Sequence, residues 1–273
     1  MEPHVYKEWI AGIFDRAAES YGKKHSSFFD YFAKNLVSLA ALPPGAHVLD
    51  VATGRGAILK QIAAAVGPLG KAVGVDISSN MIEQTAKDLA DYPHVQLLCG
   101  DAEQLEFDEH SFDYLFCGFG VFFFPHALQA LQGFFKLLKP GGRLLISTWG
   151  KEDDICSVTL QEALNEFGPQ IKTRLHEFHR PDFIWETLSS CGFVDIKTTS
   201  DELDHVYPTF DDWFSSLWSY GGRGKLEKLT FQQLIELKES LHTRLHPYLK
   251  PDGLHKFLQA YYTQAMKPGE DLS

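Results

Sequence analysis

Short apolar runs alternate with amphipathic segments over the first half of the chain. Runs rich in Val, Leu, Ile and Phe, as in buried strands, occupy residues 48–51, 72–75, 95–98, 114–117 and 143–148. Segments with apolar residues every three or four positions, as in helices, occupy residues 57–66, 80–92 and 127–138. This alternation predicts a mostly parallel sheet with helices on both faces.

The ends of the chain read as mainly helical. Before the first strand, residues 6–20 and 26–39 predict two helices. After the last run, helices are predicted at residues 155–167, 182–191, 211–220, 231–249 and 253–266. Two further strands, 194–199 and 203–207, are predicted around a turn at Ser200-Asp201-Glu202. The expected domains are an N-terminal helical cap (1–41), a sheet core (42–210, with an insertion at about 151–181) and a C-terminal helical cap (211–273).

Composition narrows the class of partner. The net charge of −11 disfavours a nucleic-acid partner, and a small molecule is expected instead. No signal sequence and no run of membrane-spanning length is evident. The scattered Cys99, Cys117, Cys156 and Cys191 indicate reduced thiols in the cytoplasm. The sequence does not indicate an oligomeric state.

A glycine-spaced turn follows the first predicted strand. Asp50 ends the strand, and Gly54 and Gly56 leave room for a backbone to approach a nucleotide-like ligand. Twenty residues past Gly56, Asp76 ends the second strand, where a carboxylate accepts both hydroxyls of a ribose. The alternative reading of Asp76 is a helix N-cap. Leu59 occupies the position at which a dinucleotide fingerprint requires Gly or Ala.

The third and fourth strands also end in distinctive residues. Asp101-Ala102 follows the third strand and Cys117 lies at the end of the fourth. Parallel strands bring their carboxyl ends to one edge, where ligands bind. We therefore expect Asp50, Asp76, Asp101 and Cys117 to surround one cleft.

In order and spacing, these motifs across residues 46–149 resemble those of the class I S-adenosylmethionine-dependent methyltransferases, especially the ubiquinone/menaquinone-biosynthesis type. The resemblance implies a Rossmann-like fold with a seven-stranded, mostly parallel sheet, a helical cap, and S-adenosyl-L-methionine as cofactor. An NAD(P)-dependent oxidoreductase is disfavoured by Leu59. A cofactor-binding protein that does not methylate, such as a cyclase or a partner-binding scaffold, stays open because the motifs report binding and not turnover.

The resemblance also assigns cofactor contacts. It implies that Asp76 binds the ribose and that Asp101 binds the adenine amino group. The positions assigned are Tyr21, Asp50, Ala52, Gly54, Gly56, Asp76, Ile77, Met81, Asp101, Ala102 and Cys117. Structural alternatives stand beside several of these roles. Asp50 and Asp101 are also suited to capping a turn or helix, and Met81 to filling the core.

The segment after the fourth strand bears on the methyl acceptor. Gly118 stands where relatives often carry Arg, and the run Phe119 to Phe124 is almost wholly apolar. This run indicates core packing, an apolar acceptor site, or both. The Asn/Asp-Pro-Pro-aromatic signature of amine methylation is missing here. We therefore expect O- or C-methylation of a small hydrophobic or aromatic metabolite.

No catalytic base is identified by the sequence. Weak candidates are His126, Tyr21 and His179, followed by His176 and Tyr220. His176 and His179 with the nearby Asp182 have a spacing that a metal site allows, but a fourth ligand is lacking. No metal is therefore predicted.

Overall fold

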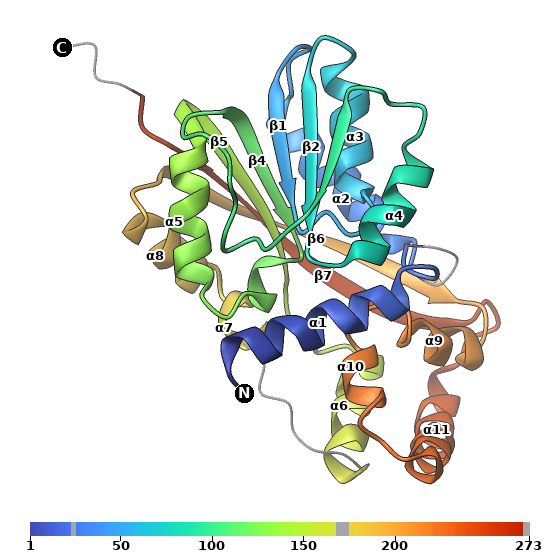
Figure 1. The fold of residues 1–273 in the computed structure, drawn as a ribbon. Helices are drawn as coiled ribbons and strands as arrows, with labels where there is room; N and C mark the ends of the chain where they lie inside the picture. The colour runs from blue at the N-terminus through green and yellow to red at the C-terminus, as the bar shows by residue number, and fades with distance from the viewer. Residues whose placement is uncertain (23–25, 168–174, 270–273) are drawn as a thin grey trace.

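One sheet organises the molecule (Figure 1). The computed structural model describes residues 1–22, 26–167 and 175–269. The sheet has seven strands in the order β3-β2-β1-β4-β5-β7-β6. The strands are β1 (His47–Val51), β2 (Lys71–Asp76), β3 (Val95–Cys99), β4 (Phe112–Gly118), β5 (Leu138–Trp149), β6 (Val194–Tyr207) and β7 (Leu254–Met266). Neighbouring strands pair in parallel from β3 to β5, whereas β7 is antiparallel to both β5 and β6. The predicted seven-stranded, mostly parallel sheet is confirmed.

Helices cover both faces of this sheet, so successive residues of β1 are buried on opposite sides. Val48 packs with α2 (Phe28–Ala40) and α3 (Ala57–Val66), while Leu49 packs with α5 (Ala127–Leu137) and α8 (Pro181–Ser190). Both residues are fully buried. Burial on two sides explains why the strand reads as a continuous apolar run.

The remaining helices are α1 (Pro3–Ala17), α4 (Ser79–Asp88), η1 (Val121–Phe123), α6 (Ile155–Phe167), α7 (Leu175–Phe178), α9 (Phe210–Ser216), α10 (Arg223–Leu226), α11 (Phe231–Leu245) and η2 (His246–Tyr248). Helix α4 packs against β2 and β3. Helices α6, α9, α10 and α11 share a buried cluster around Trp213 and Leu237, and we call this group the cap. Helix α1 lies between the sheet and the cap (Figure 1).

The helix predicted for residues 253–266 is wrong, because this segment forms β7. Its apolar residues fit both periods. Leu254, Phe257, Leu258 and Tyr261 have helical spacing. In the structure, however, every second residue from Leu254 to Ala260 is buried, and the residues between them are more exposed. The segment forms a strand because it pairs with β5 on one side and β6 on the other. The predicted C-terminal cap is therefore helical only as far as η2.

The turn predicted at residues 200–202 is also wrong, because β6 runs through it without interruption. Within the strand, the Asp201 carboxylate accepts hydrogen bonds from Asn35 Nδ2 at 2.7 Å, Tyr262 Oη at 2.9 Å and Tyr31 Oη at 3.2 Å. A polar triplet is tolerated here because β6 is an edge strand. Asp201 therefore joins α2 to β6 and β7.

The cysteines agree only in part with a common setting for all four thiols. All four cysteines are free thiols; Cys117 and Cys156 are buried, but Cys99 is exposed. Across the described ranges, no helix is both long and apolar enough to cross a membrane. Residues 168–174 of the predicted insertion lie outside the described residues.

We expect Asp201→Ala to lower the free energy of unfolding by about 1–3 kcal/mol, because three donors lose their acceptor. Chemical denaturation measures this, and Asp201→Asn should lose less because an amide retains one acceptor oxygen. Asp153→Ala, at an exposed loop position, is the control. Equal stability of Asp201→Ala and this control would contradict the role of Asp201.

Candidate functional site

A cavity lies at the carboxyl ends of β1 to β4, beneath α1. It holds about 700 Å³ of empty space, its open mouth included. Small-molecule sites are typically concave, with mostly apolar walls and a few placed polar groups, and the residues lining this cavity have that composition. Seven of the predicted cofactor residues line it: Tyr21, Ala52, Gly54, Asp76, Ile77, Asp101 and Ala102.

The turn after β1 brings the backbone close to this cavity. Ala52, Gly54 and Gly56 have positive φ angles of 56°, 53° and 74°. A Cβ on Gly56 would lie 2.7 Å from Thr85 Cγ2, so only glycine fits there. A Cβ on Gly120, after β4, would lie 2.6 Å from the Ala52 Cβ. The two loops therefore approach each other with no room for further side-chain atoms.

Asp76 is held by backbone donors at the end of β2. Its carboxylate accepts from Gly54 N at 2.7 Å and from Ser78 N at 2.9 Å. Burial, aided by the nearby Asp15 carboxylate and opposed by these two hydrogen bonds, raises the pKa of Asp76 to about 6. Each carboxylate oxygen has a second acceptor position, so Asp76 remains able to accept from ligand hydroxyls.

Asp50 lies behind the cavity wall instead of lining it. Its Oδ2 accepts from Thr53 Oγ1 at 2.6 Å, which is the turn-capping role given as the alternative. Its buried Oδ1 has no hydrogen-bond partner in the described part of the chain. Burial, opposed by the Thr53 hydrogen bond and reinforced by Asp76, raises the Asp50 pKa to about 7. An unpaired carboxylate oxygen in a dry site fits a positively charged ligand nearby.

Asp101 follows β3 and contacts α1. Its Oδ1 accepts from Glu103 N at 2.9 Å, and its Oδ2 accepts from Lys7 Nζ at 2.7 Å. Lys7 also pairs with the Glu103 carboxylate. Sequence reasoning missed Lys7, because its partners lie more than 90 residues away and no local pattern links them.

One face of α1 forms the roof of the cavity. Lys7, Ile10 and Phe14 all line it, at the three- and four-residue spacing of a single helix face. Ile10 and Phe14 lie within the helix predicted at residues 6–20 and have the spacing of one helix face, so this periodic signal was available in the sequence.

Three predicted cofactor residues besides Asp50 do not line the cavity. Gly56 begins α3, Met81 is fully buried in the first turn of α4, and Cys117 is fully buried in β4. Burial raises the pKa of the Cys117 thiol, with a further contribution from Asp50, so this thiol stays protonated. The cofactor roles of all the assigned residues remain predictions.

Among the candidate bases whose side chains the structure describes, Tyr21 alone lines the cavity. Its ring stacks on Phe29 with ring centroids 4.8 Å apart. Burial raises the pKa of Tyr21, so its phenol stays protonated at neutral pH. His126 is exposed at the start of α5 and His179 is half-buried after α7, and neither lines the cavity.

Tyr220 and His176 are the two remaining candidate bases. The Tyr220 ring contacts Phe28 at 6.2 Å, beside the cap, and burial raises its pKa also. The His176 side chain lies outside the described part of the structure. In the described part, no group of three His, Cys, Asp or Glu side chains is arranged to hold a metal ion.

The apolar run after β4 is divided between the core and the cavity wall. Val121 and Phe122 are buried in the core, whereas Phe119, Phe123 and Phe124 line the cavity. Phe119 has a φ of 51°, a strained value for a bulky residue, and stacks on Trp149 at 4.0 Å.

Gly118, at the end of β4, lies against the Ile58 side chain. A Cβ on Gly118 would lie 2.2 Å from Ile58 Cδ1, so the arginine that the family resemblance places at this position would require the Ile58 side chain to move.

Acidification should stabilise the cofactor-free protein through Asp50. Its folded pKa of about 7 exceeds the unfolded value of about 3.9, so folding takes up a proton between these limits. This contribution, on the order of a few kcal/mol, is full below pH 4 and is lost as pH rises through 7. Denaturation of wild type and Asp50→Asn at pH 5 to 8 measures it.

The difference between the two stability profiles isolates Asp50 from other carboxylates. Asp91→Asn, at an exposed position, should give a profile parallel to that of the wild type. A parallel profile for Asp50→Asn would contradict the raised pKa.

Comparison with known proteins gives a consistent result. Residues 4–172 match the model of the ubiE/COQ5 methyltransferase family. The chain is 29% identical over 228 residues to a nocamycin O-methyltransferase from Saccharothrix syringae, covering 77% of this chain and 81% of that protein. It is 32% identical over 212 residues to a demethylmenaquinone methyltransferase from Staphylococcus epidermidis, covering 72% and 83% respectively. A SAM-dependent methyltransferase structure from Aquifex aeolicus shares the fold, with a TM-score of 0.52, 16% identity, and coverage of 86% and 88%.

Proposed function

Because the chain belongs to the ubiE/COQ5 methyltransferase family, we propose that it methylates an oxygen or carbon atom of a small hydrophobic or aromatic metabolite. It is an S-adenosyl-L-methionine-dependent methyltransferase. The acceptor class is proposed from the composition of the cavity, which is lined by acidic residues at strand ends and by aromatic residues.

The acidic side suits the cofactor. In the proposed arrangement, Asp76 accepts from the ribose hydroxyls and Asp101 from the adenine amino group. The Gly54 turn allows close backbone approach, and the unpaired Asp50 oxygen lies in a region that favours positive charge. When bound, the cofactor supplies an activated methyl group on a sulfonium. The chain's own residues bind it, aim it and exclude water.

The aromatic side suits the acceptor. Phe14, Phe119 and Phe123 line the cavity, and the Phe14 and Phe123 rings meet edge to face at 5.4 Å. Behind them, Phe29 and Trp149 extend the aromatic surface. Planar apolar molecules pack well on such walls. The relatives named for nocamycin and demethylmenaquinone support an acceptor of this class.

The titratable groups around the cavity limit how the acceptor loses its proton. Lys7 is paired with Asp101, Tyr21 stays protonated, and Asp76 is assigned to the ribose. These assignments leave no described residue of the cavity wall free as a strong base. We therefore propose an acceptor with an acidic proton, such as a phenol or an enol, that ionises with water as the proton carrier.

Asp76→Ala should weaken S-adenosyl-L-methionine binding by about 1–3 kcal/mol, because a charged acceptor is lost. Isothermal calorimetry measures the change in affinity, and Asp91→Ala is the matched surface control. Unchanged affinity in a folded Asp76→Ala protein would refute the proposed cofactor placement.

The acceptor class is tested with a panel of phenols, enols, quinols, aliphatic amines and nucleobases, with mass spectrometry of the products. We expect a gain of one methyl group on hydroxylated aromatic compounds. Phe123→Ala should raise the acceptor KM several-fold through lost aromatic packing, about 1 kcal/mol, with little change in cofactor affinity. Methylation confined to amines, or no methylated product, would contradict the proposal.

A further inference from the structure

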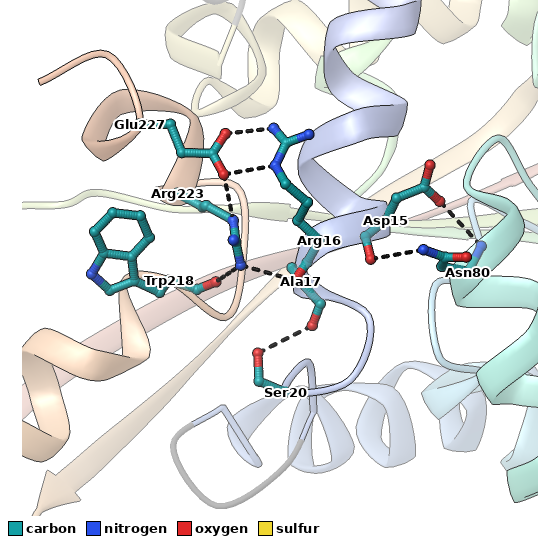
Figure 2. A network of polar contacts seen from close by, with 8 residues as sticks. All are labelled: Asp15, Arg16, Ala17, Ser20, Asn80, Trp218, Arg223 and Glu227. Atoms are coloured by element: carbon teal, nitrogen blue, oxygen red, sulfur yellow. Dashed lines mark hydrogen bonds and ion pairs between the residues drawn. The ribbon is translucent and has the colours of Figure 1, made fainter.

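Two neighbouring residues at the end of α1 point in opposite directions (Figure 2). Asp15 faces the sheet core, where its Oδ1 accepts from Ser78 Oγ at 2.6 Å and from Asn80 N at 3.1 Å. Asn80 Nδ2 donates to the Asp15 backbone oxygen at 3.2 Å. These contacts fix the end of α1 to the start of α4, directly after Asp76.

Arg16 faces the cap instead. Its guanidinium donates to both Glu227 oxygens, from Nε at 2.8 Å and from Nη2 at 2.5 Å. Arg223 Nε donates to the same carboxylate at 2.7 Å. Arg223 Nη1 donates to the Arg16 backbone oxygen at 2.9 Å and to that of Trp218 at 3.3 Å (Figure 2). Glu227 is therefore shared by an arginine from each side of the interface.

The same interface is closely packed. A Cβ on Gly224 of α10 would lie 2.4 Å from Ile13 Cδ1 and 2.9 Å from Trp9. A Cβ on Gly221, in the preceding loop, would lie 3.1 Å from Phe123, which lines the cavity. Helix α10 and its loop thus contact both the roof and the aromatic wall of the cavity.

A single helix therefore connects three parts of the molecule. Lys7, Ile10 and Phe14 face the cavity, Asp15 holds the core, and Arg16 holds the cap. Because α1 is one rigid element, a shift of its cavity face also moves the atoms that bind Glu227.

We propose that Arg16 and Glu227 are positioning residues, through which a cofactor bound beneath α1 orders α10 and residues 218–222. The inference rests on the proposed cofactor site and goes beyond it, because the ordered segment flanks the aromatic wall assigned to the acceptor. Exposed ion pairs add little to overall stability. The expected effect is a coupling between two sites.

Hydrogen exchange with and without S-adenosylhomocysteine tests the coupling. The amides of Arg223, Lys225 and Glu227 are hydrogen-bonded within this segment, so their exchange reports its opening. In wild type, the ligand should slow exchange both in α1 and in residues 218–229, by about two- to fivefold in the latter, the size expected of exposed ion pairs. Glu227→Gln and Arg16→Met should keep the slowing in α1 and lose most of it in residues 218–229, where the Arg223 bond to the Arg16 backbone oxygen remains.

Two controls separate coupling from general damage. Asp211→Asn breaks the exposed Lys238–Asp211 pair within the cap, and should leave the ligand effect on residues 218–229 intact. Arg16→Lys keeps the positive charge but not the bidentate hydrogen bonding to Glu227, and should retain part of the ligand-induced slowing of exchange in residues 218–229. Raising the ionic strength should weaken the effect in wild type, since exposed charges are screened.

The outcomes are distinct. Equal slowing of residues 218–229 in wild type and Glu227→Gln, or none in wild type that binds the ligand, would overturn the proposal. Loss of ligand binding in Glu227→Gln, measured by calorimetry, would also overturn it, because the pair lies outside the cavity. Failure of the proposed cofactor site would instead show as absence of binding heat in wild type.

Discussion

The hydrogen bond from the Gly54 backbone N–H to the Asp76 carboxylate, at 2.7 Å, is the contact on which the site depends. It joins the turn after β1 to the end of β2. Two further bonds support it: Thr53 N donates to Val75 O at 3.0 Å, and Thr85 Oγ1 donates to Gly54 O at 2.7 Å. The lack of side-chain atoms at Gly54 and Gly56 permits this approach. The cavity wall is therefore set mainly by backbone geometry.

This arrangement leaves the cavity short of positive charge. Asp50 and Asp76 are buried on adjacent strands, and their pKa values are raised to about 7 and 6, chiefly by burial. Lys7, the cation lining the described cavity, is engaged with Asp101 and Glu103. A sulfonium carries the charge that such a site lacks. The electrostatics of the site thus agree with the cofactor of the family.

Helix α1 relates the two halves of the proposed reaction. Lys7 contacts Asp101 on the proposed cofactor side, Phe14 contacts Phe123 on the aromatic wall, and the last turn is bound to the cap. A helix shared in this way provides a physical route between cofactor binding and acceptor binding. Asp15 binds Ser78 before α4 and Arg16 binds Glu227 after α10, so the last turn of α1 is joined to both parts of the molecule.

The sequence by itself determined the elements whose pattern is local. Helix α3 begins and ends where its periodicity predicts, and the strands β1 to β5 lie where the apolar runs lie. Asp76 and Asp101 were found because parallel strands present their carboxyl ends at one edge. The tertiary structure decided what local pattern leaves open. Residues 254–266 fit either period and became β7 through pairing with β5 and β6, and Asp201 became an acceptor inside a strand. Lys7 and the Arg16–Glu227 pair depend on contacts across 94 and 211 residues, where helix packing and not sequence spacing brings the charges together.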